Sequence, residues 1–312
     1  MQNFVTVRLP PSGLGHSLES YSRAFTYYAN GYAEFVHPNW FKLHVGPYLR
    51  RELDKRDYWR IIKTPSTWGL HPLHSFRRFF CRVVSEAEFD PRKNRQFLIV
   101  QDEGPHSFAR LQPHKQKFVS ALESLSRHTP KQRFSAPSIG IFHRSGDFRV
   151  LGPGKGANER VRRTHGYGYI PPEYAAEALR KCRRIAGWQV PAVLSTDASL
   201  DEVRCITDMG AVTLARVDSS FANMLEMRHH DVLILGTSSY GRWSFFMGEA
   251  FGVFPKTAEI TNDSFQPLGI AGRQGAWFVF ETETSLNALP TADAVRERLV
   301  APCVTSARSS KS

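Results

Sequence analysis

The sequence has no apolar run long enough to cross a membrane and no two cysteines close together. A membrane-spanning helix needs about 18 or more apolar residues in succession, and no stretch approaches that length. The N-terminus lacks a charged segment followed by an apolar stretch, so we expect no secretory signal. The cysteines, Cys81, Cys182, Cys205 and Cys303, are far apart, which disfavours a disulfide framework and a zinc site. We therefore expect a cytoplasmic protein with reduced thiols.

Acidic pairs with metal-binding spacing are also missing. No Asp-x-Asp occurs in the 312 residues, which disfavours an enzyme that holds a diphosphate through a divalent cation. The histidines of HPLH (71–74) and RHH (228–230) have no third ligand at a useful spacing. We expect no metal, so arginines and helix N-termini would have to neutralise a bound phosphate.

Positive charge is in excess, with 41 Lys and Arg against 29 Asp and Glu and a formal net charge of +12. Three kinds of partner fit that sign: nucleic acid, an anionic membrane surface, or a phosphate-bearing small substrate. The basic residues are spread widely, so a solvated surface explains any one cluster equally well. No RNA- or DNA-binding module is recognisable, which argues mildly against a specific nucleic-acid partner.

Alternating strand and helix patterns predict an α/β fold with two domains. The chain opens with a strand (4–9), a glycine loop and a helix (17–31), and a more regular series starts at the strand 139–143. We place the boundary in the polar, proline-bearing segment near Pro130, giving two domains, 1–134 and 135–312. Two Rossmann-like domains would face a cleft. The last helix, 291–299, is a candidate to pack back on the first domain.

The first candidate site is the segment SIGIFHRSGDFRV (138–150). Its buried strand ends in polar residues at the edge where α/β sheets bind ligands. Arg144 could grip a phosphate through two parallel hydrogen bonds, and Gly146 would let the backbone approach the ligand. Asp147 could hold Arg144 in place or act on the substrate. An ordinary turn explains Ser-Gly-Asp almost as well.

Two later strand ends carry similar groups. In GTSS (236–239) the hydroxyls of Thr237, Ser238 and Ser239 meet the N-terminus of a helix, which favours anions. A plain serine N-cap is an equally good interpretation. Asp197, in VLSTD (193–197), could accept a hydrogen bond from a sugar hydroxyl or a nucleobase, or could cap a helix.

The loop SGLGH (12–16) falls short of the dinucleotide fingerprint, because Leu18 occupies the place of the third glycine. Gly13 and Gly15 bring the backbone close to something, which could be a phosphate, a sugar or a neighbouring element. His16 opens the helix that follows. Tight packing explains the two glycines as well as a ligand does.

In this order the segments resemble the fucosyltransferase superfamily of α-1,2, α-1,6 and protein O-fucosyltransferases, and most of all the α-1,2 branch. The opening VRLPPSGLGHSLESYSRAFTYYANG resembles that branch's strand, Gly-Gly-Leu-Gly-Asn-Gln loop and aromatic helix. FHRSGDF resembles His-x-Arg-Arg-Gly-Asp-Tyr, and VLSTD resembles Phe-Ser-Asp-Asp. NMLEMRHHDVLILGTSSYGRW (223–243) resembles a helix, a strand and the motif Asn-Ser-x-Phe-Ser-Trp-Trp. The likeness covers nearly the whole chain and is weakest from 50 to 130.

The resemblance implies a GT-B fold and metal-independent, inverting transfer from a GDP-sugar. It implies that domain 135–312 binds the nucleotide sugar and that domain 1–134 lies on the acceptor side. Arg144 matches the arginine that contacts the donor phosphates, and Gly146, Asp147 and Ser238 match other motif positions. Four positions depart from the motifs: Phe142 replaces the histidine, with His143 beside it, Ser145 the second arginine, Asn223 an acidic residue and Arg242 a tryptophan. These departures leave the nucleobase and the sugar open.

The combined prediction is a glycosyltransferase that moves L-fucose from GDP-fucose to a hydroxyl of a glycan acceptor. Arg144 and the helix start at 237–239 would stabilise the departing diphosphate, and His16, Glu19 and Asp147 are candidates for the general base. The donor contacts would come from a larger set: Gly13, Gly15, His143, Arg144, Gly146, Asp197, Asn223, Thr237, Ser238, Ser239 and Arg242. Alternatives are another nucleotide sugar, a basic nucleic-acid-binding protein, or a non-catalytic lectin-like relative. Peripheral contact with an anionic membrane is a further expectation.

Overall fold

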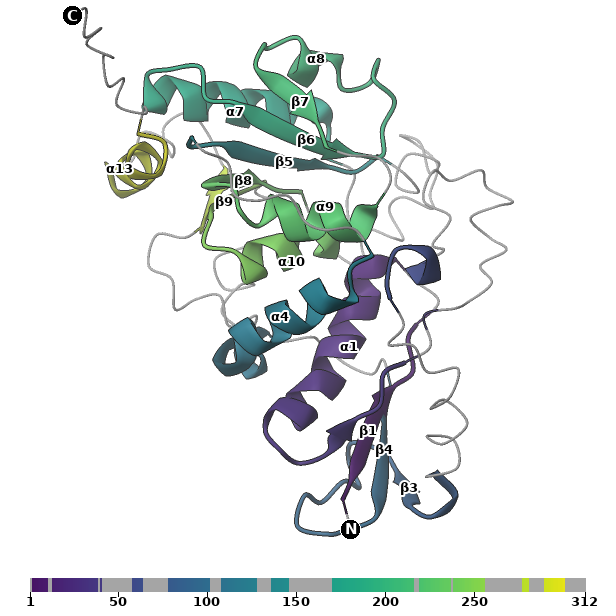
Figure 1. Cartoon of the computed structure of the whole chain (residues 1–312). Coiled ribbons are helices and arrows are strands. Elements are labelled where there is room, and N and C mark those ends of the chain that lie inside the picture. The colour runs from purple at the N-terminus through teal and green to yellow at the C-terminus, as the bar shows by residue number, and fades with distance from the viewer. Residues whose placement is uncertain are drawn as a thin grey trace, which may run out of the picture.

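The protein contains two parallel β-sheets with helices between them (Figure 1). The computed structural model describes residues 2–10, 13–38, 40, 58–63, 78–101, 108–127, 136–145, 170–215, 219–236, 238–255, 277–280 and 289–300. Every strand pair within these residues is parallel. The predicted α/β class with two Rossmann-like sheets is therefore confirmed.

The first sheet has the strand order β2-β1-β4-β3. Its strands are β1 (Phe4–Val7), β2 (Glu34–Phe35), β3 (Arg82–Val84) and β4 (Gln96–Val100). Alternate residues of β1 are buried, as expected for a strand with a helix on one face. That helix, α1 (Leu14–Ala29), has Asn30 as its C-cap, and Gly31 follows with φ of 76°. Glycine adopts this left-handed conformation without the strain that a side chain adds.

The second sheet has the order β10-β9-β8-β5-β6-β7. Its strands are β5 (Ile139–His143), β6 (Ala192–Thr196), β7 (Val212–Leu214), β8 (Val232–Ile234), β9 (Phe251–Pro255) and β10 (Trp277–Phe280). The chain runs outward from β5 to β7, then returns to β8 and runs outward the other way. This is the doubly wound order. Successive strands are added in one direction from β5 and in the opposite direction from β8, so the order reverses between these two strands. Ligands of such sheets bind at the carboxyl ends of the strands beside that reversal.

Helices cover both faces of the second sheet. One face packs against α7 (Pro172–Ala186), α8 (Arg204–Thr207) and α13 (Leu289–Arg298), and the other packs against α9 (Ser220–Met227) and α10 (Ser239–Met247). The side chains of β8 show the alternation that this requires, since Val232 and Ile234 face the first group while Leu233 faces the second. A strand buried on both faces is apolar throughout.

A single apolar cluster joins the two halves. It contains Val5 and Leu18 from the first half and Leu233 and Trp243 from the second. The helices α1, α4 (Lys115–Leu125) and α10 meet there (Figure 1). Short 3-10 helices lie before α4 in the chain, at Tyr58–Arg60, Phe108–Arg110 and Gln112–His114.

Most predicted elements occur, with shifted bounds. Helix α1 starts three residues before the predicted 17, whereas the predicted helix 199–209 is reduced to α8, because Ser199 and Glu202 form a turn ahead of it. The helix α13 packs against α7 and β9, and Trp188 Nε1 donates to Leu299 O at 2.8 Å. It therefore lies beside the second sheet, and its packing back on the first half stays a prediction. The boundary at 134 stays a prediction.

None of the helices within the described ranges is long and apolar enough to span a bilayer.

Candidate functional site

Arg144 follows β5 at the point where the strand order of the second sheet reverses. The carboxylate of Asp197, which directly follows the neighbouring strand β6, lies beside it. Its side chain is 37% exposed, and its Nε lies 3.9 Å from Asp197 Oδ2. The backbone N–H of Ser145 donates to Asp197 Oδ1 at 2.7 Å. Asp197 thus holds the turn that carries Arg144. The sequence predicts either a ligand contact or a helix cap for Asp197. It offers Asp147 as the residue that holds Arg144 in place or acts on the substrate.

Ser145 makes a second contact between the segments that follow β5 and β6. Its hydroxyl donates to Glu202 Oε1 at 3.1 Å, and it is buried. The other oxygen of Glu202 accepts from the backbone N–H and the hydroxyl of Ser199, at 3.0 and 2.9 Å. Sequence reasoning missed the role of Glu202, although Ser-x-x-Glu is the spacing of a capping box. A serine at 145 thus fixes the turn where the resemblance expects a second arginine.

His143, the last residue of β5, is buried and pairs with Thr196 of β6. Its Nδ1 lies 3.1 Å from Thr196 Oγ1. Burial lowers the pKa of His143, and the neighbouring carboxylates of Asp197 and Glu202 offset only part of that effect. A neutral, buried imidazole fits a structural role at the strand end better than a contact with phosphate.

The glycine loop of the first half touches both candidate sites of the second. A Cβ added to Gly13 would lie 3.8 Å from Arg144 Nη1, which is an ordinary contact. A Cβ added to Gly15 would lie 2.5 Å from Ser239 Oγ and 2.7 Å from the backbone nitrogen of Tyr240. The start of α1, Arg144 and the start of α10 are therefore neighbours. At Gly15 the close approach is to protein, which favours the packing interpretation there.

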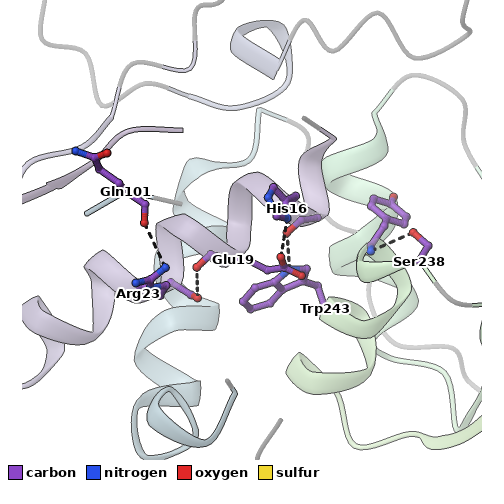
Figure 2. A network of polar contacts seen from close by, with 9 residues as sticks. His16, Glu19, Arg23, Gln101, Ser238 and Trp243 are labelled. Carbon is purple, nitrogen blue, oxygen red and sulfur yellow. Dashed lines mark hydrogen bonds and ion pairs between the residues drawn. The ribbon is translucent and has the colours of Figure 1, made fainter. Parts of the chain in front are cut away.

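The start of α10 is capped by its own serine. Tyr240 N–H donates to Ser238 Oγ at 3.2 Å (Figure 2), so Ser238 is the N-cap that the sequence allowed as an alternative. Trp243 Nε1 donates to Gly15 O at 2.8 Å. Ser239 lies in the first turn, against α1. The first turn of α10 still presents the positive end of the helix dipole to this region.

A histidine–carboxylate pair stands at the start of α1. His16 Nδ1 lies 2.8 Å from Glu19 Oε2, with the two side chains 40% and 16% exposed (Figure 2). One turn further, Arg23 donates to Gln101 O at 3.2 Å and pairs with Glu86 at 2.5 Å. The carboxylate of Glu19 orients the imidazole of His16, as in acid–base catalytic pairs.

Two residues that were predicted to contact the sugar donor, Asn223 and Arg242, lie on the helices α9 and α10. Asn223 is buried within α9. Arg242 is half-buried on α10, and its Nε is enclosed with no hydrogen-bond acceptor among the described residues. Gly146, Asp147 and Thr237 lie outside the described residues, so their roles stay predictions.

Apolar packing limits where a ligand can lie. Behind the start of α1 and α10, the rings of Trp243, Phe108, Phe118 and Phe246 fill the space between the halves. A bound molecule would therefore lie at the rim where the two helices begin. Within the described part of the chain, no group of three or more His, Cys, Asp or Glu could hold a metal ion.

The chain matches no family model and no curated protein. Among solved structures, it is similar to the fucosyltransferase NodZ from Bradyrhizobium, with 12% identity over 80% of this chain and 93% of that chain and a TM-score of 0.40. A NodZ α-1,6-fucosyltransferase co-crystallised with GDP gives a TM-score of 0.39 at 12% identity, over 80% and 93% of the two chains. POFUT1 in complex with GDP-fucose gives 0.31 at 13% identity, over 81% and 73%.

Proposed function

We propose that this protein is an inverting, metal-independent glycosyltransferase of the cytoplasm that transfers L-fucose from GDP-fucose to a hydroxyl of a glycan acceptor. The observation that carries the proposal is the meeting of Arg144, Gly13 and the start of α10 at one rim. Three segments far apart in the sequence converge there, at the carboxyl ends of β5 and β8. The fold, enzyme class and donor in this proposal rest on the sequence motifs together with that geometry.

The reaction makes its largest electrostatic demand on the leaving diphosphate. As the acceptor oxygen attacks the anomeric carbon, negative charge builds on the departing phosphate oxygens. Arg144 would neutralise it through charge-assisted hydrogen bonds, and the N-terminus of α10 would add its dipole. Asp197 keeps the guanidinium in place before the reaction, which is the condition for electrostatic stabilisation of a transition state.

His16 is the proposed general base, and Glu19 orients it. An imidazole with one nitrogen held by a carboxylate can take the acceptor proton on the other. The pair stands at the start of α1, three residues after the glycine that touches Arg144. Asp147, the third candidate, lies outside the described residues.

Calorimetric titration with GDP, UDP and TDP tests the donor, and release of GDP from GDP-fucose tests the reaction. We expect GDP to bind and Arg144→Ala to lower turnover about 10²–10³-fold without unfolding the protein. Arg180→Ala is the matched control, because Arg180 is an exposed arginine on α7 paired with Glu177. Binding of UDP but not GDP would overturn the fucose assignment and leave a transferase for another nucleotide sugar. Absence of binding by all three would overturn the function itself.

A further inference from the structure

Two adjacent phenylalanines are exposed at the far end of the first sheet. Phe79 and Phe80 are 83% and 64% exposed. They directly precede β3, which lies at the end of the molecule opposite the second sheet (Figure 1). Each exposed ring leaves apolar surface in contact with water, which is unfavourable. Exposed apolar groups that cluster in this way mark interaction surfaces.

Cations flank the two rings along the chain and in the loop beside β3. Arg82 N–H donates to Arg95 O at 2.8 Å, which places the loop before β4 beside β3. Two carboxylates are close, since Glu88 lies 4.0 Å from Arg82 and Asp90 lies 3.9 Å from Lys93. The cations outnumber them, and all are exposed: Arg78, Arg82, Arg92, Lys93 and Arg95.

The loop that carries three of these cations is held in one conformation. The side-chain amide of Gln96 donates to Asp90 O at 2.5 Å and to Lys93 O at 3.2 Å. Asn3 donates to Lys93 O as well, at 2.8 Å. Arg95 adopts φ of 59°, which is uncommon for a residue with a side chain. The loop therefore carries its three cations next to β3 on a backbone that is held in one conformation.

We propose that Phe79, Phe80 and these five cations form a docking surface for a membrane rich in anionic lipids. Guanidinium groups bind headgroup phosphates, and aromatic rings enter the boundary between headgroups and acyl chains. Single-stranded nucleic acid also combines cations with aromatic rings, on which its bases stack. The sequence contains no recognisable RNA- or DNA-binding module, so we commit to the membrane as the occupant. The surface lies at the amino ends of the strands, where Arg82 pairs with Gln96. The candidate site lies beyond their carboxyl ends, so docking leaves it uncovered, and the proposal is independent of the reaction proposed above.

The test uses the full chain and sedimentation with vesicles of phosphatidylcholine alone or mixed with phosphatidylglycerol. We expect binding to the mixed vesicles only, weakened by salt. Phe79→Ser combined with Phe80→Ser should reduce binding at least about tenfold. The matched control is Leu200→Ser, because Leu200 is 60% exposed in the second half of the chain; it should bind like the wild type.

Three outcomes would each overturn the proposal. The first is equal binding to both vesicle types. The second is unchanged binding by the double serine variant with its thermal unfolding intact. The third is displacement of the vesicles by single-stranded RNA, with RNA binding that needs Arg82 and Arg92. A Phe79→Trp variant gives a second measurement, since its added fluorescence should shift to shorter wavelength on mixed vesicles. No shift would also contradict the proposal.

Discussion

Trp243 Nε1 donates a hydrogen bond of 2.8 Å to the backbone oxygen of Gly15, and this bond joins the two halves of the protein (Figure 2). The indole also packs against Phe108 and Phe118. Its ring thus closes the apolar interface while its polar atom reaches the first turn of α1. This contact fixes the distance between the N-terminal ends of α1 and α10, which form the candidate rim.

The closeness of Gly15 to α10 predicts a stability effect. Gly15→Ala places a Cβ 2.5–2.7 Å from Ser239 Oγ and the Tyr240 nitrogen, so α1 and α10 must separate. Overpacking of this kind costs about 1–3 kcal/mol, measured as the free energy of unfolding in denaturant. Gly13→Ala is the control, since its Cβ would make an ordinary contact. Equal stability of the two variants would contradict the tight packing.

Asp197 is predicted to act through Arg144. Asp197→Asn can still accept from the Ser145 N–H but loses the charge beside the guanidinium. We expect kcat to fall roughly 10–100-fold, because a misplaced group costs rate even when binding persists. Asp201→Asn is the matched control, since Asp201 is an exposed aspartate of the following turn. A fall in donor affinity with kcat unchanged would instead indicate that Asp197 contacts the donor.

The proposed base predicts a change in pH dependence. His16→Gln should lower kcat about 10²-fold and remove the acid side of the pH–rate profile, because glutamine has no proton to gain in that range. Glu19→Gln should keep that acid side and reduce the rate less, since it removes only the orienting carboxylate. The measurement is GDP release across pH with saturating acceptor. A wild-type profile in His16→Gln would exclude this histidine as the base.

His230 predicts that the protein loses stability in mild acid. It is buried, with Nδ1 3.0 Å from Ser138 Oγ, and burial lowers its pKa to about 3. The unfolded chain takes up a proton near pH 6.5 while the folded chain does not, so stability falls as the pH drops below that value. Between pH 7 and pH 5 the loss from this residue is roughly 2 kcal/mol.

The control for this effect is His230→Gln, which is expected to be less stable at pH 7 but to lose less stability between pH 7 and pH 5. Denaturant unfolding at the two pH values measures both proteins. An identical loss in the variant would show that other groups, such as the buried His143, cause the acid sensitivity.

The sequence predicted the strand ends better than the roles of the residues on them. The strand 139–143 and the helix 172–186 are as predicted, because apolar runs and proline at a helix start are local signals. The short β3 and the strand β9 were not predicted. In β3 two of three residues are exposed, so it lacks the alternation that identifies a strand.

Local patterns determined by themselves that the chain is α/β and that polar groups follow the strands near 144 and 238, because secondary structure depends on neighbours in sequence. Only the tertiary structure decided which of those groups meet. It placed Gly15 against Ser239, bound Ser145 to Glu202, and filled the space between the halves with Trp243. Such pairs lie tens to hundreds of residues apart along the chain, and their contact follows from strand order and helix packing, which no local pattern encodes.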